Sequence, residues 1–211
     1  MTVRQPLPSS LAGSPVVAIV RGGDPAFLLP TCEALLDAGI VHLEITTNTE
    51  GWEDAIRTLS VREGAVIGSG TVLNAEHVAR TVAAGGTFVV APNVSAEVGA
   101  AAAGAGIGWY PGALSPTEIV HAWDLGATAV KVFPAKSAGG PGYLADVRAP
   151  LSHISIMPTG GVALTDIAAY RAAGAVAVGL GSPLLGDALR GGSLDDLAAR
   201  ARTALAEATR G

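Results

Sequence analysis

One unit recurs along the whole sequence: a short apolar run, a turn, an alanine-rich stretch of helical character and a turn that contains glycine. The apolar runs are rich in Val and Ile and do not alternate with polar residues, which is typical of parallel strands buried on both faces. They occupy residues 16–20, 41–46, 65–70, 87–92, 107–112, 129–134, 154–161 and 175–182. Strands that alternate with helices in this way predict an α/β fold.

The segments between the runs favour helices, because most open with Ser, Thr, Asp or Asn and end on Gly. Eight such units in 211 residues predict a single-domain, closed (β/α)8 TIM barrel over residues 15–211, preceded by an extension or short helix at 1–14. The alternative is an open doubly wound sheet, which would need no eighth closing unit.

Composition excludes several classes of protein. A net charge of −5, a pI near 5.3 and the absence of a basic run argue against a nucleic-acid partner. The single cysteine, Cys32, excludes an intramolecular disulfide and suits a reducing cytoplasm. The first 15 residues contain no apolar signal-peptide core, and no stretch approaches the roughly 20 apolar residues of a membrane span. We therefore expect a soluble, cytoplasmic protein that acts on a small molecule.

Function in such a barrel lies at the carboxyl ends of the strands, and one lysine is conspicuous there. Lys131 lies in AVKVF, and it and Lys136 are the only lysines, although Lys and Arg together number 13. Strand alternation places Lys131 and Phe133 on the face opposite two valines, so the lysine is expected to point into the barrel. Burial of an ammonium group is costly, which favours the neutral nucleophile that a Schiff base requires. The alternatives are pairing with Glu44 or extension out of the barrel mouth.

Other strand-end groups complete a candidate site. Glu44 ends the second run, VHLEIT, and can pair with Lys131, shuttle protons for it, or both. The turns TGG at 159–161 and LGS at 180–182 follow the seventh and eighth runs, where barrels frequently bind phosphate through backbone N–H groups. The alternative for each is a simple tight turn. Lys136, in a glycine-rich loop, is expected to be solvated.

Metal and nucleotide sites are not indicated. The four histidines, His42, His77, His121 and His153, have no metal-ligand spacing, and Cys32 lies in a helical stretch without a base beside it. No Walker loop or dinucleotide-binding fingerprint occurs. We therefore expect neither a metal nor a cofactor.

These motifs, in their order, resemble one enzyme family. VVAIVRG, LEITTNT, IGSGTVL, the proline of the fourth run, YPG, VKVFPA, PTGGV and GLGS extend from about Pro15 to Gly186. Together they resemble the 2-keto-3-deoxy-6-phosphogluconate and 4-hydroxy-2-oxoglutarate aldolases, which are class I (Schiff-base) enzymes. The resemblance implies cleavage of a 2-keto-3-deoxy acid to pyruvate and an aldehyde such as glyceraldehyde 3-phosphate, without metal, by a homotrimer.

The resemblance also implies a role for each matching residue. Lys131 corresponds to the Schiff-base lysine and Glu44 to the proton-shuttling glutamate. Thr71 and Arg21 correspond to contacts of the substrate carboxylate, Pro92 and Phe133 to apolar walls, and the phosphate-binding positions match Gly160, Gly161, Gly181 and Ser182.

One position departs from many phosphogluconate-cleaving members, which have an arginine where this chain has Asn48. Loss of a bidentate cation weakens the case for tight phosphate binding. Asn48, with Trp52 and PNVSAEV at 92–98, is similar to the 2-keto-3-deoxy-6-phosphogalactonate branch. Asn48 could instead bind a sugar hydroxyl. A non-aldolase phosphate-binding barrel enzyme and a non-catalytic sugar-phosphate binding protein remain as alternatives.

Overall fold

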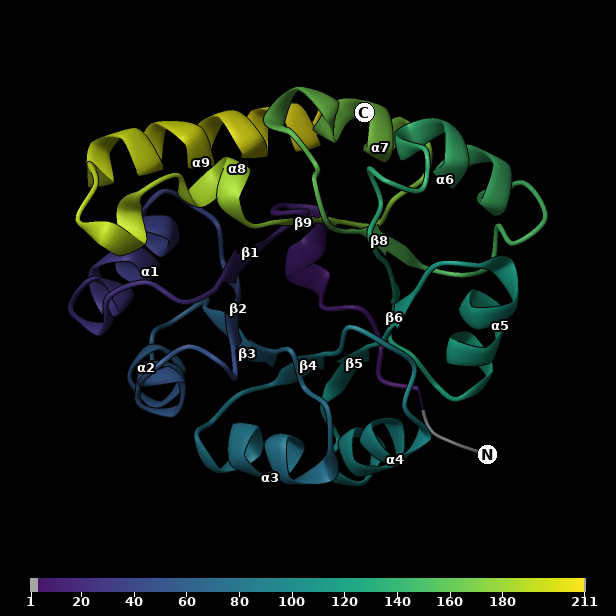
Figure 1. Ribbon diagram of the computed structural model, residues 1–211, viewed down its shortest axis with the longest axis horizontal. Helices are drawn as coiled ribbons and strands as arrows, with labels where there is room; N and C mark the ends of the chain where they lie inside the picture. The colour runs from purple at the N-terminus through teal and green to yellow at the C-terminus, as the bar shows by residue number, and fades with distance from the viewer. Residues whose placement is uncertain (1–3, 211) are drawn as a thin grey trace.

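The strands form a ring around the centre of the molecule, and the helices lie outside it (Figure 1). This computed structural model describes residues 4–210, so the first three residues of the expected extension and residue 211 of the expected barrel lie outside the described part. The strands are β1 (Val16–Val20), β2 (His42–Thr46), β3 (Val66–Gly70), β4 (Phe88–Val90), β5 (Gly108–Tyr110), β6 (Gly112–Ala113), β7 (Val130–Val132), β8 (Ile156–Pro158) and β9 (Val178–Leu180).

The strands pair in parallel and form two sheets. A six-stranded sheet has the order β5-β4-β3-β2-β1-β9, and a three-stranded sheet has the order β6-β7-β8. The order follows the chain without the reversal that a doubly wound sheet requires. The prediction of an α/β fold with parallel strands is confirmed, but the ladders form two sheets where one closed ladder was expected.

The two sheets come together at both ends. Only Pro111 separates β5 from β6, and proline has no N–H to donate to a ladder. Its carbonyl accepts a hydrogen bond from the Lys131 N–H at 2.9 Å. At the other junction Thr159 and Gly179 form an isolated parallel bridge. One strand was expected over 107–112; the structure divides it at Pro111.

The helices match the segments expected from their capping residues. The side chains of Asn74, Ser95, Ser115 and Ser193 accept hydrogen bonds from the N–H three residues later and so begin four helices. The helices are α1 (Leu28–Asp37), α2 (Trp52–Leu59), α3 (Ala75–Ala83), α4 (Ala96–Ala105), α5 (Pro116–Asp124), α6 (Gly140–Arg148), α7 (Ile167–Ala172), α8 (Ser182–Leu185) and α9 (Leu194–Ala208), with 3-10 turns η1 (Ser9–Ala12), η2 (Pro25–Phe27), η3 (Leu164–Asp166) and η4 (Ala188–Arg190). Two of these, α8 and η4, were not anticipated from the sequence.

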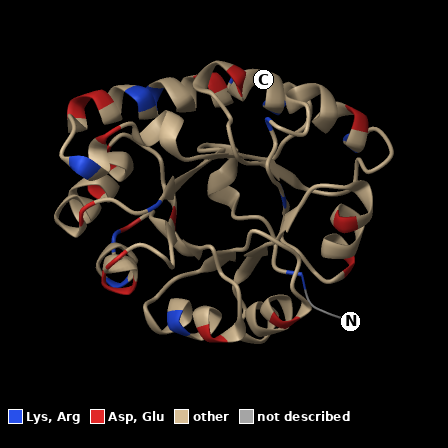
Figure 2. Cartoon of the chain, viewed as in Figure 1, with Lys and Arg blue, Asp and Glu red and all other residues tan. Residues whose placement is uncertain are grey.

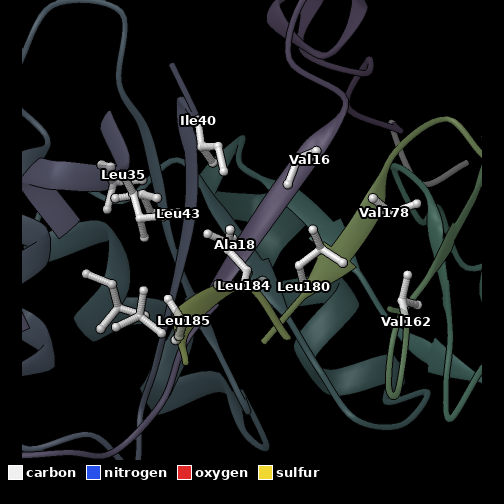
Figure 3. Packing of buried hydrophobic residues seen from close by; sticks show 14 of the residues in the cluster. Val16, Ala18, Leu35, Ile40, Leu43, Val162, Val178, Leu180, Leu184 and Leu185 are labelled. Atoms are coloured by element: carbon white, nitrogen blue, oxygen red, sulfur yellow. The ribbon is translucent and has the colours of Figure 1, made fainter. Parts of the chain in front are cut away.

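Strand parity divides the buried residues into two cores. Val16 and Ala18 of β1 face outward and pack with residues such as Leu35, Leu43 and Leu184 (Figure 3). Residues of the opposite parity form a second cluster inside the ring, which contains Leu11, Val17, Phe88, Val90, Tyr110, Ala129, Met157 and Ala177. The interior of the ring is therefore a packed core, as in closed barrels of this size.

The segment before β1 crosses the ring at the amino ends of the strands (Figure 1). Leu11 of η1 packs into the inner cluster, and Ser10 Oγ lies 2.9 Å from His42 Nε2. Arg4 donates to the Ala127 carbonyl at 2.9 Å, and its guanidinium lies 3.5 Å from the centre of the Trp123 ring. These contacts tie the segment to the ring.

Charged side chains are concentrated on the outer helices, with few on the strands (Figure 2). Within residues 4–210, every helix is too short or too polar to span a lipid bilayer. Two charged side chains, Glu44 and Lys131, are nevertheless buried, and burial of a charge is costly unless the charge is paired or used.

Candidate active site

Lys131 points into the ring, as strand alternation predicts. Its neighbours Val130 and Val132 pack in the outer core, whereas Ala129 belongs to the inner cluster. Lys131 is 4% exposed, and its Nζ lies 5.3 Å from the centre of the Phe133 ring. The backbone of Lys131 pairs with Gly112 and Met157, so the lysine is held by strands on both sides. A carbonyl group entering from the carboxyl end would meet this amine.

Glu44 is the acidic partner of that amine. It is fully buried, and its Oε1 lies 3.9 Å from Lys131 Nζ, which is longer than a hydrogen bond. Neither carboxylate oxygen has a hydrogen-bond partner among the described residues. Burial raises the pKa of Glu44, against the opposing charges of Lys131 and Arg21. A buried carboxyl group with free acceptor sites beside an amine is suited to exchange protons with a bound molecule.

Glycines make room for these side chains inside the ring. A Cβ on Gly70, at the end of β3, would lie 2.0 Å from Glu44 Oε1. A Cβ on Gly179, in β9, would lie 2.4 Å from Thr159 Oγ1. Gly70 of β3 and Gly179 of β9 therefore leave space that any larger residue would occupy.

A cavity of about 420 Å³ opens above Lys131 at the carboxyl ends of the strands. Seven of the eleven residues singled out from the sequence line it: Arg21, Lys131, Phe133, Gly160, Gly161, Gly181 and Ser182. Gly160 and Gly161 have positive φ angles of 91° and 74°, which glycine adopts without strain. Ser182 is the first residue of α8. The two glycine-rich turns thus lie at one side of one cavity, with Lys131 in its lining.

Thr71 and Arg21 meet on another side. Arg21 Nη2 donates a hydrogen bond to Thr71 Oγ1 at 3.3 Å, although Arg21 follows β1, Thr71 follows β3, and β2 lies between these strands. Thr71 has a φ of 58°, the only positive value for a non-glycine residue in the described part of the chain. A β-branched residue in this conformation is strained, and such strain is characteristic of functional sites.

Four of the eleven residues do not line this cavity: Glu44 and Thr71 lie next to Lys131 and Arg21, which do, whereas the other two lie further away. Pro92 lines a neighbouring groove that shares Phe133 with the main cavity, so these two apolar side chains are on adjoining surfaces. Asn48 is exposed in the turn after β2 and does not line the cavity. Both remain predictions.

Thr159 is the first residue of the TGG turn, and the sequence alone did not single it out as a site residue. Its hydroxyl is buried without a partner among the described residues, and it lines the cavity between Lys131 and Gly179. Its distinguishing signal is strand parity, because it lies two positions after the inward-facing Met157.

Residues 4–210 contain no cluster of three or more His, Cys, Asp and Glu side chains that could hold a metal. His42 faces the inside of the ring but is bonded to Ser10, and burial lowers its pKa to about 4. Burial raises the pKa of Cys32 to about 12. A thiol in that state is not a nucleophile.

Comparisons with known proteins show which family the chain resembles. The chain is 39% identical to the 2-dehydro-3-deoxy-6-phosphogalactonate aldolase of Escherichia coli K12 over 81% of this chain and 84% of that one. It is 34% identical to the 2-dehydro-3-deoxy-phosphogluconate aldolase of Dickeya dadantii over 94% of both chains.

A structural relative has been captured with a reaction intermediate. The KDPG aldolase of Legionella pneumophila, described with pyruvate captured at low pH as a covalent carbinolamine intermediate, has a TM-score of 0.79 and 27% identity over 94% of this chain and 96% of that one. The KDPG and KHG aldolase family model matches residues 7–199. The resemblance found in the sequence is therefore confirmed: the chain belongs to the KDPG and KHG aldolase family.

Proposed function

We propose that the protein is a class I aldolase that cleaves 2-keto-3-deoxy-6-phosphogluconate, 4-hydroxy-2-oxoglutarate or both, with Lys131 as the Schiff-base residue and Glu44 as the proton shuttle. The observation that carries the proposal is the pair of buried side chains, the Lys131 amine in the lining of the cavity and the Glu44 carboxyl group 3.9 Å from it. The carbinolamine captured in the Legionella relative supports the same chemistry.

The proposed reaction begins at the C2 carbonyl of the substrate. The neutral Lys131 amine attacks the carbon to form a carbinolamine, and loss of water gives an iminium ion. Removal of the C4 hydroxyl proton, relayed through Glu44, breaks the C3–C4 bond and releases the aldehyde. The bonding electrons move into the iminium, which becomes an enamine. Protonation at C3 and hydrolysis then release pyruvate and restore the amine.

The remaining residues of the cavity have proposed binding roles. Arg21 and Thr71 hold the carboxylate, and Phe133 and Pro92 border the pyruvyl carbons. The glycine-rich turns at Gly160–Gly161 and Gly181–Ser182 bind the phosphate. Asn48, at the rim, contacts a hydroxyl of the sugar chain.

A second substrate is favoured by two observations. The 39% identical relative from Escherichia coli is named a 2-dehydro-3-deoxy-6-phosphogalactonate aldolase, and Asn48, with Trp52 and PNVSAEV at 92–98, is similar to that branch. The alternative proposal is therefore 2-keto-3-deoxy-6-phosphogalactonate, which differs at C4. Steady-state comparison of the three substrates tests it, and a preference for the unphosphorylated acid would contradict the phosphate assignment.

The proposal extends to the molecule as a whole. The contacts at both junctions of the two sheets support one closed (β/α)8 barrel and a single catalytic domain over 15–211, with 1–14 as an extension. A homotrimer follows from the family resemblance. A cytoplasmic location is compatible with a lone, buried cysteine.

Trapping with borohydride tests the mechanism. Incubation with pyruvate and borohydride should leave a reduced pyruvyl group on Lys131, found by peptide mass spectrometry. Lys136 is the matched control, because it is exposed and is the only other lysine. Lys131→Ala should lose the adduct and the activity, whereas Lys136→Ala should keep both. Full activity of Lys131→Ala would refute the mechanism, and turnover without an adduct would favour a phosphate-binding barrel enzyme of another class.

A further inference from the structure

The turn after β2 holds both proposed carboxylate contacts, although none of its side chains lines the cavity. Residues 46–49 read TTNT, and each of the three threonine hydroxyls makes a hydrogen bond. The bonds reach two different loops of the ring. Thr49 bonds the N–H of Gly22, next to Arg21, and Thr47 bonds the carbonyl of Thr71 itself, while the Thr46 hydroxyl bonds that of Thr49.

Thr47 holds the end of β3. Its N–H donates to the Gly70 carbonyl at 2.9 Å, and its hydroxyl donates to the Thr71 carbonyl at 3.0 Å. Thr47 therefore binds two successive carbonyls, and the second belongs to the residue with a φ of 58°. A strained conformation persists only where neighbouring groups fix it. The Thr47 hydroxyl is such a group.

Thr49 holds the end of β1. Its hydroxyl accepts a hydrogen bond from the Gly22 N–H at 2.9 Å, and Gly22 directly follows Arg21. The buried Thr46 hydroxyl lies 2.9 Å from the Thr49 hydroxyl and fixes its orientation. The two loops meet where Arg21 Nη2 donates to Thr71 Oγ1 at 3.3 Å.

We propose that Thr47 and Thr49 are positioning residues that hold the carboxylate-binding pair Thr71 and Arg21 through their backbone groups. The proposal rests on the proposed function, since it takes the bound group to be the carboxylate of a 2-keto acid. It assigns one task to β2 and another to the turn that follows: Glu44 of the strand moves protons, and the turn sets where the substrate carboxylate binds.

Trapping on Lys131 as a function of ligand concentration tests the proposal. Thr47→Val and Thr49→Val remove each hydroxyl with little change of shape, whereas Thr47→Ser and Thr49→Ser retain it. Loss of one such bond should raise the pyruvate concentration for half-maximal trapping about 3- to 10-fold, and the serine variants should stay near the wild type. Thr203→Val is the matched control, because the Thr203 hydroxyl makes a comparable 3.0 Å bond to the Ala199 carbonyl on the exposed face of α9.

Acetone provides the specific readout, because it has the carbonyl group of pyruvate but lacks the carboxylate. Trapping of acetone on Lys131 should be unchanged in the valine variants. Equal weakening for pyruvate and acetone would show a general disturbance of the lysine and overturn the proposal. Unchanged pyruvate trapping in both valine variants would also overturn it, while the proposed function would stand. No pyruvate adduct in the wild type would instead refute the proposed function, and the positioning role with it.

A double-mutant cycle keeps the test informative if Thr47→Val is less stable than the wild type. Glycine adopts a positive φ freely, so Thr71→Gly removes the conformational constraint that Thr47 is proposed to maintain. Adding Thr47→Val to Thr71→Gly should weaken pyruvate trapping by less than Thr47→Val does in the wild type. Additive losses would contradict the coupling.

Discussion

Glu44 is a buried carboxyl group whose protonation state should control the proposed reaction. Glu44→Gln keeps the size of the side chain but cannot exchange a proton, so kcat for cleavage should fall about 100-fold or more. Because burial raises the pKa of Glu44, the group gains its proton at a higher pH than an ordinary glutamate of pKa 4.5. The acidic limb of the pH profile of kcat/KM should therefore have a midpoint above 4.5 and should disappear in the glutamine variant. An unchanged kcat would contradict this role.

The backbone conformation of Thr71 is expected to lower the stability of the fold while placing its hydroxyl in the site. Thr71→Gly relieves a strained φ of 58°, so the free energy of unfolding should rise, by up to about 1 kcal/mol. The same change removes a hydroxyl proposed to bind the carboxylate, and half-maximal trapping of pyruvate should require about tenfold more ligand. Denaturant titration and borohydride trapping measure the two effects. Thr71→Ser is the control, because it retains the hydroxyl, and tighter pyruvate binding by Thr71→Gly would contradict the assignment.

Glu44 was predicted from its place near the end of the second apolar run. Strand parity predicted that Lys131 and Phe133 share the inward face, because alternation alone decides which side of a strand a residue faces. It could not predict the conformation of Thr71 or the bonds of Thr47. Those depend on how two loops from different strands approach each other, which no local pattern in either loop encodes.

Gly70, the last residue of β3, leaves the space that the Glu44 side chain occupies. Its backbone does not have a positive φ, and the three atoms nearest to an alanine Cβ there all belong to the Glu44 side chain, with Oε1 at 2.0 Å. Gly70→Ala should lower the free energy of unfolding by about 1–3 kcal/mol and reduce kcat, because Glu44 must move. Gly104→Ala is the matched control. It has open space around its Cβ in α4 and should raise stability by about 0.5–1 kcal/mol.

Thermal or denaturant unfolding of the two variants, with kcat measured in parallel, checks this contrast. A stable and fully active Gly70→Ala would show that Glu44 has freedom that the packing does not indicate.

The element scale was the most predictable from the sequence. Runs of Val and Ile and the capping residues gave the strands and most helices, and β1 agrees at both ends with the expected range 16–20. The division at Pro111 follows from the missing proline N–H. The helix α8 was not anticipated, because its four residues, SPLL, are too few to show a helical period.

At the scale of the whole molecule, the amino ends of the strands are covered by the segment before β1, which crosses the ring and contacts His42. No period in the sequence indicates this contact. Ser10 and His42 are 32 positions apart, and their side chains meet because η1 folds back beneath the strands. Leu11 fills the inner cluster beside them at 6% exposure. The sequence indicated an extension or short helix at 1–14 but did not indicate how this segment packs.

That contact makes global stability dependent on pH. Burial lowers the pKa of His42 from 6.5 to about 4, so the unfolded chain binds this proton more tightly than the folded protein does. Stability from this residue is complete above pH 6.5 and is lost as the pH falls toward 4. The shift corresponds to a loss of roughly 3 kcal/mol.

His42→Asn should flatten the pH dependence of the free energy of unfolding in this window. His121→Asn is the control, because His121 is exposed on α5, and this variant should lose stability at low pH as the wild type does. Urea titrations at several pH values between 4 and 7 measure both. If the two variants lose stability in parallel with the wild type, the acid sensitivity arises elsewhere, and the ring tolerates a charged histidine beside Ser10.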